Sequence, residues 1–380
     1  MVSHSAGFSL RLASSAKRVE IAQQVNWRVK MDNDGGEDLQ QVHLRLDDQL
    51  LCEPFDLPRG KKKALIFWRA YTQPGEVNET VQAAASTPGG ERLVRQAQGK
   101  TLVLGLADLR LPLAPGISLD LQRVPAGEFL MSSLPSDYPR AGLGEQPKQK
   151  VSLDEYFIGK YPVTVAQFAA FIKATGYRTT AEATGSGSVW KDGGWKKIKW
   201  VSWQFPSGPG GGVKYKAKYP VTQVSWTDAV AFCQWASKAT GRNVRLPTSA
   251  EWEKAAYGMD GRLYPWGNEA PDADHCNFAG NVGDVTPVGR YSPQGDSPYG
   301  CADMAGNVWE WCSDEYEDPS EGDYYEYSGG GNPVGKEKDH RLQRGGSWMH
   351  YDNDLRSLYR LGKVASTWNT SMGFRCALSP

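Results

Sequence analysis

Three short strings of residues between positions 245 and 377 constrain the fold of this chain more than any other feature. They are Arg245-Leu-Pro-Thr-Ser-Ala-Glu-Trp-Glu253, Gly306-Asn-Val-Trp-Glu-Trp311, and Arg344-Gly-Gly-Ser-Trp348 followed by Gly373-Phe-Arg-Cys-Ala377. We expect their glycines where the backbone is tight, their aromatic residues in the core and their arginines in buried hydrogen bonds. The 14 Trp, 17 Tyr and 42 Gly of the chain favour either irregular loops packed by aromatic side chains or a large contact surface.

The order of these strings resembles that in the sulfatase-modifying-factor family, whose founding members are formylglycine-generating enzymes on a C-type-lectin-like fold. Residues 121–131 and 156–164 match the first two strands of that family. The resemblance therefore runs from residue 121 to residue 380. It implies an α+β fold class, with a C-type-lectin-like domain of the formylglycine-generating-enzyme type over 121–380.

In these enzymes a pair of active-site cysteines follows the Gly-Gly-Ser-Trp string, and here the matching positions hold His350 and Leu355. The resemblance therefore implies a protein that is not an enzyme, with no copper expected. An oxidase or other enzyme of the family with chemistry independent of cysteine is the alternative. None of His275, His340 and His350 has a partner at the spacing of a nucleophilic dyad.

The last forty residues keep the frame of the family at Arg344 to Trp348, Arg356, Arg360 and 372–377, while the residues between depart from the enzymes. This resembles the variable proteins of diversity-generating retroelements and predicts a variable ligand-binding segment over 344–377. The expected ligand is a protein or other macromolecule, bound at the C-terminal face; a divergent inactive family member without a variable role is the alternative. The residues expected to bind are His350, Tyr351, Asn353, Asp354, Tyr359, Leu361, Gly362, Trp368, Asn369, Thr370 and Ser371.

Loops on a rigid frame can change sequence without unfolding the domain, and aromatic residues dominate contact energies. All of these positions except Tyr359, Trp368 and Ser371 are expected to be exposed on one face. The frame residues are expected to be buried.

The string from Asp303 to Glu310 is the best candidate metal site. A tight Gly-Asn turn can present the carboxylates of Asp303 and Glu310 together with the backbone carbonyls of Gly306 and Val308, and calcium prefers such oxygen ligands. The family resemblance implies calcium at these positions. The alternative is a packing turn in which Glu310 pairs with an arginine.

A second calcium site of the family is only half matched. Asn277 and Phe278 are present, but the loop over 280–287 is short and only Asp284 offers a carboxylate. A structural loop is therefore the favoured interpretation there.

Residues 1–115 have a different pattern. Alternating apolar and polar residues at 25–29, 42–46, 65–68 and 81–85 predict an antiparallel β-sandwich. This region resembles Ig-like modules, although a sandwich of unrelated topology fits the pattern as well. Two prolines in 111–116 predict a break before the second domain, with residues 116–120 as the linker.

Helices are expected over 165–175, 227–240 and 249–257, capped by Thr164, Thr227 and Ser249 respectively, because apolar residues recur there at helical spacing. Gly241 is expected to end the second helix. Residues 177–220 contain several glycines and tryptophans and are expected to form a long insertion without regular structure. Such loops are often functional.

Composition excludes several functions. Lys+Arg and Asp+Glu are both 43, so no nucleic-acid partner is expected. The chain has no run of eighteen apolar residues and no signal-peptide pattern at its start, so we expect no membrane insertion and a cytoplasmic location. Six cysteines without a C-x-x-C pair do not require a disulfide framework; the resemblance pairs Cys233 with Cys376 in secreted members, whereas a reducing cytosol would keep them as buried thiols.

Overall fold

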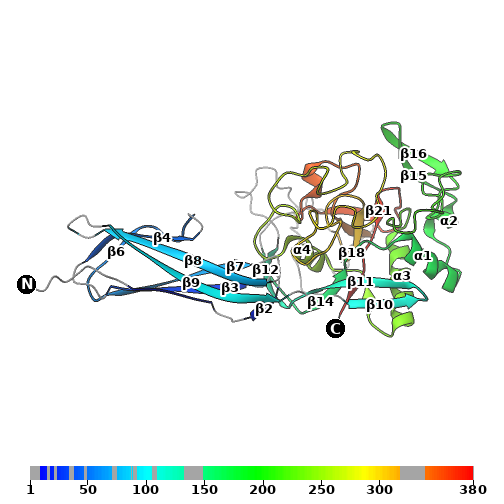
Figure 1. Cartoon of the computed structure of the whole chain (residues 1–380). Helices are drawn as coiled ribbons and strands as arrows, with labels where there is room; N and C mark the ends of the chain where they lie inside the picture. Colours follow the sequence, from blue (N-terminus) through cyan, green and yellow to red (C-terminus); the bar gives the residue numbers. More distant parts are fainter. Residues whose placement is uncertain are drawn as a thin grey trace, which may run out of the picture. The chain divides into compact units, whose positions relative to one another are not determined.

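The computed structural model describes residues 9–14, 18–20, 24–33, 38–46, 49–70, 75–86, 88, 92–104, 109–131, 149–316 and 339–379. The chain divides into two compact units, Met1–Gly105 and Leu106–Pro380 (Figure 1). Among the described residues, no helix is long and apolar enough to cross a membrane.

The first unit consists of β-strands in two sheets. One sheet has the strand order β1-β3-β7 and the other has the order β2-β9-β8-β4-β5, with β6 paired to β4 (Figure 1). The strands are β1 (Ser9–Ser14), β2 (Arg18–Glu20), β3 (Gln24–Asp32), β4 (Leu39–Leu46), β5 (Gln49–Leu50), β6 (Phe55–Leu57), β7 (Lys62–Ala70), β8 (Gly75–Ser86) and β9 (Arg92–Leu104).

The four strands expected from alternation are confirmed as parts of β3, β4, β7 and β8. Alternate residues of β3, β4 and β8 are buried, for example Val42, Leu44 and Leu46 in β4 and Val81 and Ala83 in β8, because successive side chains of a strand point to opposite faces. The Ig-like assignment of this unit stays a prediction.

The linker expected at 116–120 is instead part of a β-hairpin. Strand β10 (Leu109–Ala114) pairs with β11 (Ile117–Val124) through a turn in which Gly116 has a φ of 73°. Pro112 is tolerated because β10 is an edge strand whose pairing shifts register between Pro112 and Ala114, as prolines in strands require. The second unit therefore begins at Leu106.

The second unit is α+β, as expected. Its five-stranded sheet has the order β10-β11-β14-β22-β17, and its four-stranded sheet has the order β20-β19-β18-β21. Two hairpins, β12-β13 and β15-β16, complete the described strands. The bounds are β12 (Gly127–Met131), β13 (Gln149–Leu153), β14 (Tyr156–Gly159), β15 (Ser186–Lys191), β16 (Gly194–Lys199), β17 (Val244–Arg245), β18 (Trp309–Glu315), β19 (His340–Arg344), β20 (Leu361–Val364), β21 (Met372–Gly373) and β22 (Ala377–Leu378).

The helices are α1 (Val165–Thr175), α2 (Thr180–Thr184), α3 (Trp226–Thr240), α4 (Ser249–Tyr257) and a 3₁₀ turn, η3 (Asp352–Leu355). Thr164 caps α1 and Gly241 ends α3, as expected. The other two expected caps are wrong: Ser225 rather than Thr227 caps α3, and Thr248 rather than Ser249 caps α4. In each helix the cap forms a reciprocal capping box with an acid three residues later, which satisfies two backbone donors at once.

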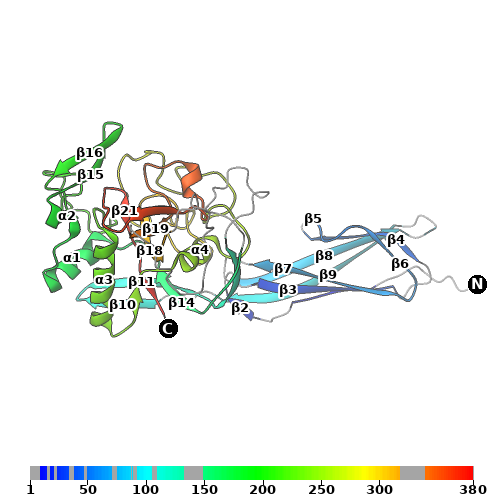
Figure 2. The same cartoon turned by 180° about the vertical axis from the view of Figure 1, so that it is seen from behind.

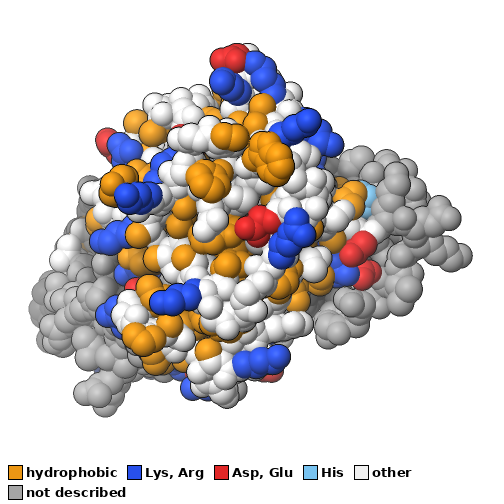
Figure 3. Space-filling model, turned by 90° about the vertical axis from the view of Figure 1, so that its right-hand side faces the viewer, with side chains coloured by type: hydrophobic (Ala, Val, Ile, Leu, Met, Phe, Trp, Pro, Cys, Tyr) orange, Lys and Arg blue, Asp and Glu red, His pale blue; other side chains and the backbone are white. Residues whose placement is uncertain are grey.

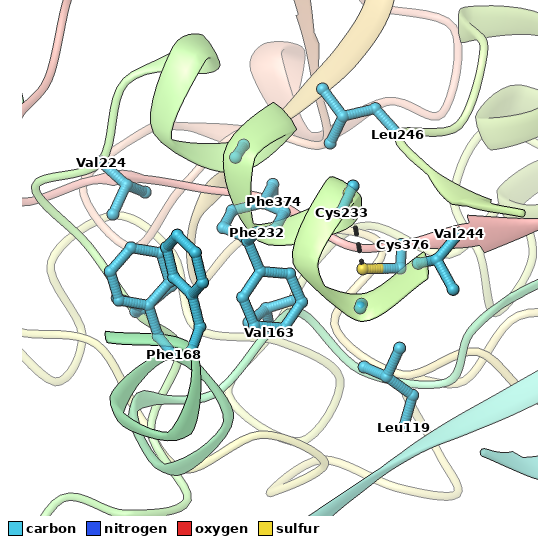
Figure 4. Packing of buried hydrophobic residues seen from close by; sticks show 14 of the residues in the cluster. Leu119, Val163, Phe168, Val224, Phe232, Cys233, Val244, Leu246, Phe374 and Cys376 are labelled. Carbon is cyan, nitrogen blue, oxygen red and sulfur yellow. Dashed lines mark hydrogen bonds between the residues drawn. The ribbon is translucent and has the colours of Figure 1, made fainter. Parts of the chain in front are cut away.

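Helices α1 and α3 lie side by side beside β10 and β11 (Figures 1 and 2). Between them lies an aromatic core in which the Phe232 ring is 6.0 Å from Phe168 and 5.4 Å from Phe374 (Figure 4). The same core brings the Cys233 and Cys376 sulfur atoms to 3.9 Å from each other. This core holds the C-terminal segment against the helices.

The insertion over 177–220 has more regular structure than expected. It contains helix α2 and the β15-β16 hairpin, which appear together at one end of the second unit (Figures 1 and 2). Thr179 and Glu182 form the capping box of α2. The isolated bridge between Ser188 and Asn369 joins the hairpin to the C-terminal segment.

Candidate ligand-binding site

Buried arginines hold the backbone of the C-terminal segment. Arg344, at the end of β19, pairs with Glu253 of α4 and donates to the carbonyls of Ser357, Leu358 and Tyr359. Arg360 also pairs with Glu253, at 2.9 Å. All three charged side chains are at most 1% exposed, so the loop after β19 is fastened by ion pairs and carbonyl contacts that water does not screen.

A third buried arginine, Arg375, fastens the end of the segment to β18. The Arg375 Nη2 atom donates to Glu310 at 2.7 Å, and Nη1 donates to the Gly159 carbonyl at 2.7 Å. Trp252 Nε1 donates to the second Glu310 oxygen at 2.7 Å. Both oxygens of the Glu310 carboxylate therefore already accept hydrogen bonds from the protein.

The two glycines after Arg344 make a sharp bend possible. Gly345 has a φ of 92° and Gly346 a φ of 72°, and a Cβ on Gly346 would lie 2.6 Å from the Leu355 side chain. Only glycine combines this backbone region with such close neighbours. The expected frame residues are all buried, which confirms that prediction: Gly345, Gly346, Trp348, Arg356, Arg360, Phe374 and Arg375.

His350, which we expect at the position of the first catalytic cysteine of the family, is held on both ring nitrogens. Trp309 Nε1 lies 3.4 Å from His350 Nε2, and Ser347 Oγ lies 2.6 Å from Nδ1. An indole N–H can only donate, so Nε2 accepts and the proton of the neutral ring is on Nδ1, donated to Ser347. His350 is therefore not placed as a base that could activate Ser347.

The neutral form of His350 is also the favoured one. Burial lowers the pKa of His350, and the positive charge of Lys363 lowers it further, whereas the negative charge of Asp354 raises it. The ring packs edge-on against Trp309 with centroids 5.3 Å apart.

Leu355, which we expect at the second cysteine position, is fully buried and packs in a cluster with Tyr264, Cys276 and Ala305. Burial raises the pKa of Cys301 to about 12 and raises the pKa of Cys276 and of Cys312 above the usual range. The thiolate is the reactive form of cysteine, so burial disfavours the reactive form of these three thiols.

The expected exposure of the variable positions is confirmed for Tyr351, whose side chain is 68% exposed. His350, Asn353, Asp354, Tyr359, Leu361 and Trp368 are half-buried. His350 and Tyr359 both contact the Trp309 ring. The turn from His350 to Asp354 is thus the most accessible part of the segment.

The expected exposure is wrong for Asn369 and Thr370, and their neighbour Ser371 is buried too, with exposed fractions of 8%, 6% and 1%. The Asn369 carbonyl accepts from the Gln223 backbone, and the Asn369 side chain accepts from the Ser371 backbone at 2.8 Å. Strand β15 lies against these residues. The insertion therefore covers positions that the sequence predicted to be on the surface.

Gly362 is also unsuited to variation. It lies in β20, where a Cβ would be 2.0 Å from the Tyr316 ring. No real Cβ contact is that short, so a larger residue would have to displace the ring.

Pattern analysis missed the contribution of the insertion to the site. Trp368 Nε1 donates to the Ser186 carbonyl, and Ser186, Ser188 and Lys197 line a groove beside Trp368. The only signal in the sequence is the Trp- and Lys-rich stretch at 190–200 within an unusually long insertion.

The candidate calcium turn fits the packing interpretation better. Asp303 accepts from the Gly289 backbone at 2.7 Å, and burial raises its pKa to about 6. Glu310 is committed to Arg375 and Trp252, so a cation could use it only by displacing the guanidinium. In the described part of the chain no three acidic, His or Cys side chains converge on one point, and calcium at Asp303, Gly306, Val308 and Glu310 stays a prediction.

The second candidate has one feature that a cation could use. Asn277 donates to the Asp284 carbonyl at 2.9 Å, while its Oδ1 is buried and has no hydrogen-bond partner among the described residues. Phe278 packs against the cluster around Leu355. Asp284 instead pairs with Lys216 at 2.7 Å, so the residues present favour a structural loop.

The short strands, the embedded helices and the arginine-fastened C-terminal segment define a C-type-lectin-like fold of the formylglycine-generating-enzyme type. The family described as "Sulfatase-modifying factor enzyme 1-like domain" matches residues 119–380, and the chain belongs to this family.

The relatives of this chain include a protein named as inactive and a protein named as an enzyme. "Inactive C-alpha-formylglycine-generating enzyme 2" of Bos taurus is 32% identical over 304 residues, which cover 70% of this chain and 90% of that protein. "Formylglycine-generating enzyme" of Thermomonospora curvata is 35% identical over 302 residues, which cover 70% of this chain and 95% of that protein. Membership of the family therefore does not decide activity.

A solved structure shares the fold. "Treponema denticola variable protein 1" aligns with a TM-score of 0.53 and 22% identity, covering 72% of this chain and 99% of that one. The likeness supports the C-type-lectin-like architecture of the second unit.

Proposed function

We propose that this protein is a non-enzymatic binding protein whose C-terminal segment, residues 344–377, recognises a protein ligand. The observation that carries the proposal is the pair of substitutions at the positions of the catalytic cysteines. His350 is held in its neutral form between Ser347 and Trp309, and Leu355 is part of the core. Neither residue can supply a thiolate.

The geometry around these positions suits binding. The buried ion pairs of Arg344, Arg360 and Arg375 hold the backbone, while the turn from His350 to Asp354 reaches the surface and carries the exposed Tyr351. A rigid frame lowers the entropic cost of binding, and an exposed tyrosine supplies contact area with few torsions to restrict.

Incubation with a Cys-x-Pro-x-Arg peptide, copper and oxygen tests the absence of catalysis. The peptide mass should stay unchanged, because no thiolate is available at positions 350 and 355. A mass loss that corresponds to aldehyde formation would support the alternative, an enzyme with different chemistry.

A display library tests the binding role. Randomising Tyr351, Asn353 and Asp354 should leave most clones folded and should yield binders to unrelated protein targets. A matched library at the buried positions Trp348, Arg356 and Phe374 should yield few folded clones. Equal loss of folding in both libraries would refute a tolerant binding surface.

A further inference from the structure

A groove with a volume of about 250 Å³ lies between the β15-β16 hairpin and the loop that carries Trp368. The Trp368 indole is fixed against β15, since its Nε1 donates to the Ser186 carbonyl at 3.0 Å. No carboxylate is among the lining residues. The side chains that line the groove are those of Thr184, Ser186, Ser188, Lys197, Thr367 and Trp368.

The segment that forms one wall of this groove is strongly basic. Residues 186–219 include seven lysines, one aspartate, and no arginine or glutamate, in a chain whose total charge is zero. Lys196 pairs with Asp192 at 2.6 Å and Lys216 with Asp284 at 2.7 Å. Within the described part of the chain Lys197, Lys199, Lys214 and Lys218 form no ion pair. Lys191 lies near the carboxylate of Asp192 and helps Lys196 to lower its pKa.

Exposed aromatic side chains accompany these lysines. Trp195, Trp200 and Tyr215 are 46%, 73% and 86% exposed. Figure 3, which views the end of the molecule that carries β15, β16 and α2, shows basic and hydrophobic side chains interleaved on one surface.

Lys197 lines the groove, and the pairing of the hairpin shows which neighbours share its face. Ser188 lies opposite Lys197, Ser186 opposite Lys199, and Trp190 opposite Trp195. Directly opposed residues share a face of a hairpin, so Lys197, Lys199 and Trp195 lie on the same face as the hydroxyl groups of the groove.

We propose that this groove binds an acidic polypeptide segment of the ligand. The inference rests on the proposed function, because it names the chemistry of the ligand that the C-terminal face would recognise. Hydroxyl groups can pair with both the N–H and the C=O of a peptide. Lys197 and Lys199 complement carboxylates, and Trp368 supplies a rigid apolar wall of the kind that anchors protein ligands.

Two other anionic partners fit less well. Nucleic-acid phosphates are preferentially recognised by the bidentate guanidinium of arginine, and the basic segment contains none. An element that binds an anionic membrane gathers its lysines on one face. In the β15-β16 hairpin, Lys196 lies on the opposite face from Lys197 and Lys199.

Titration of the full chain with poly-L-glutamate, followed by tryptophan fluorescence, tests the proposal. We expect binding at 50 mM NaCl that weakens about 10-fold or more at 300 mM, as screened ion pairs do. The double substitution Lys197→Ala/Lys199→Ala should weaken binding about 10-fold at low salt. The matched pair Lys61→Ala/Lys62→Ala, in the first unit, should change it less than about 2-fold.

Absence of binding at low salt, or equal weakening by both lysine pairs, would overturn the proposal. Tighter binding of heparin, single-stranded DNA or phosphatidylserine vesicles than of poly-L-glutamate would also overturn it in favour of that class. If the library randomised at Tyr351, Asn353 and Asp354 yields binders whose affinity is unchanged by Lys197→Ala/Lys199→Ala, the groove inference fails while the proposed function stands. If the library selects none, the proposed function fails.

Discussion

Two residues expected to occupy catalytic positions of the family are held by hydrogen bonds and by packing. At the position expected for the first catalytic cysteine, the His350 imidazole receives a hydrogen bond from Trp309 and gives one to Ser347. At the second, Leu355 is fully buried. Both residues thereby help to hold the C-terminal segment in place.

The His350 environment predicts a dependence of stability on pH. Because burial lowers the pKa of His350, the unfolded chain binds this proton more readily than the folded one as the pH falls below about 6.5, and stability is lost there. The variant His350→Gln should therefore lose less stability than the wild type between pH 7 and pH 5 in urea unfolding. Parallel curves for the two proteins would contradict this.

The Arg375 and Glu310 pair predicts a large effect on stability. Both side chains are fully buried, so Arg375→Ala leaves an uncompensated carboxylate and should cost about 3 to 5 kcal/mol of unfolding free energy. The control Lys62→Ala removes an exposed pair with Asp32 and should cost about 1 kcal/mol or less. Similar costs in urea unfolding would show that Glu310 has another partner, such as a cation.

At the scale of elements, capping boxes and tight turns set where helices and loops begin. Ser225 was missed as a cap because Thr227, two residues further on, also fits the cap preference. Thr248 was missed because Ser249, the next residue, fits it as well. The acid three residues after the true cap, Asp228 or Glu251, decides between them, since only that spacing satisfies both backbone donors.

The close approach of the Tyr316 ring to Gly362 in β20 predicts that this position requires glycine. Gly362→Ala should destabilise the protein by about 1 to 3 kcal/mol, since the new methyl group overlaps the Tyr316 ring. The control Gly194→Ala lies in β16 with no atom within 4 Å of the new Cβ and should change stability by less than about 0.5 kcal/mol. Thermal melting of both variants checks this, and a tolerated Gly362→Ala would restore that position as variable.

The turn over residues 303–310 predicts an outcome for calcium. If Asp303 and Glu310 hold a cation, chelation should lower the melting temperature, and Asp303→Ala should abolish that effect. Unchanged melting curves with chelator would favour the ion pair of Glu310 with Arg375 as the final arrangement.

At the scale of the whole molecule, no sheet of the described residues combines strands from both units. Sheets that are each confined to one unit favour independent folding. Calorimetry of the full chain should show two thermal transitions, and a fragment over residues 106–380 should keep one of them at its original temperature. A single transition that shifts in the fragment would mean that the units fold as one.

Much of the second unit follows from the sequence alone. The glycine, tryptophan and arginine strings predicted the family and the frame of buried residues, and helical spacing predicted the positions of α1, α3 and α4. These features depend on local backbone preferences and on residue types at fixed spacing, which a single sequence displays directly.

Tertiary structure decided the rest. The sequence could not show that β15 covers Asn369 and Thr370, that Tyr316 excludes a side chain at Gly362, or which arginine would pair with Glu310. Each of these depends on segments far apart in the chain that meet only in the folded core. The groove beside Trp368 exists for the same reason, since an insertion and the C-terminal segment form it jointly.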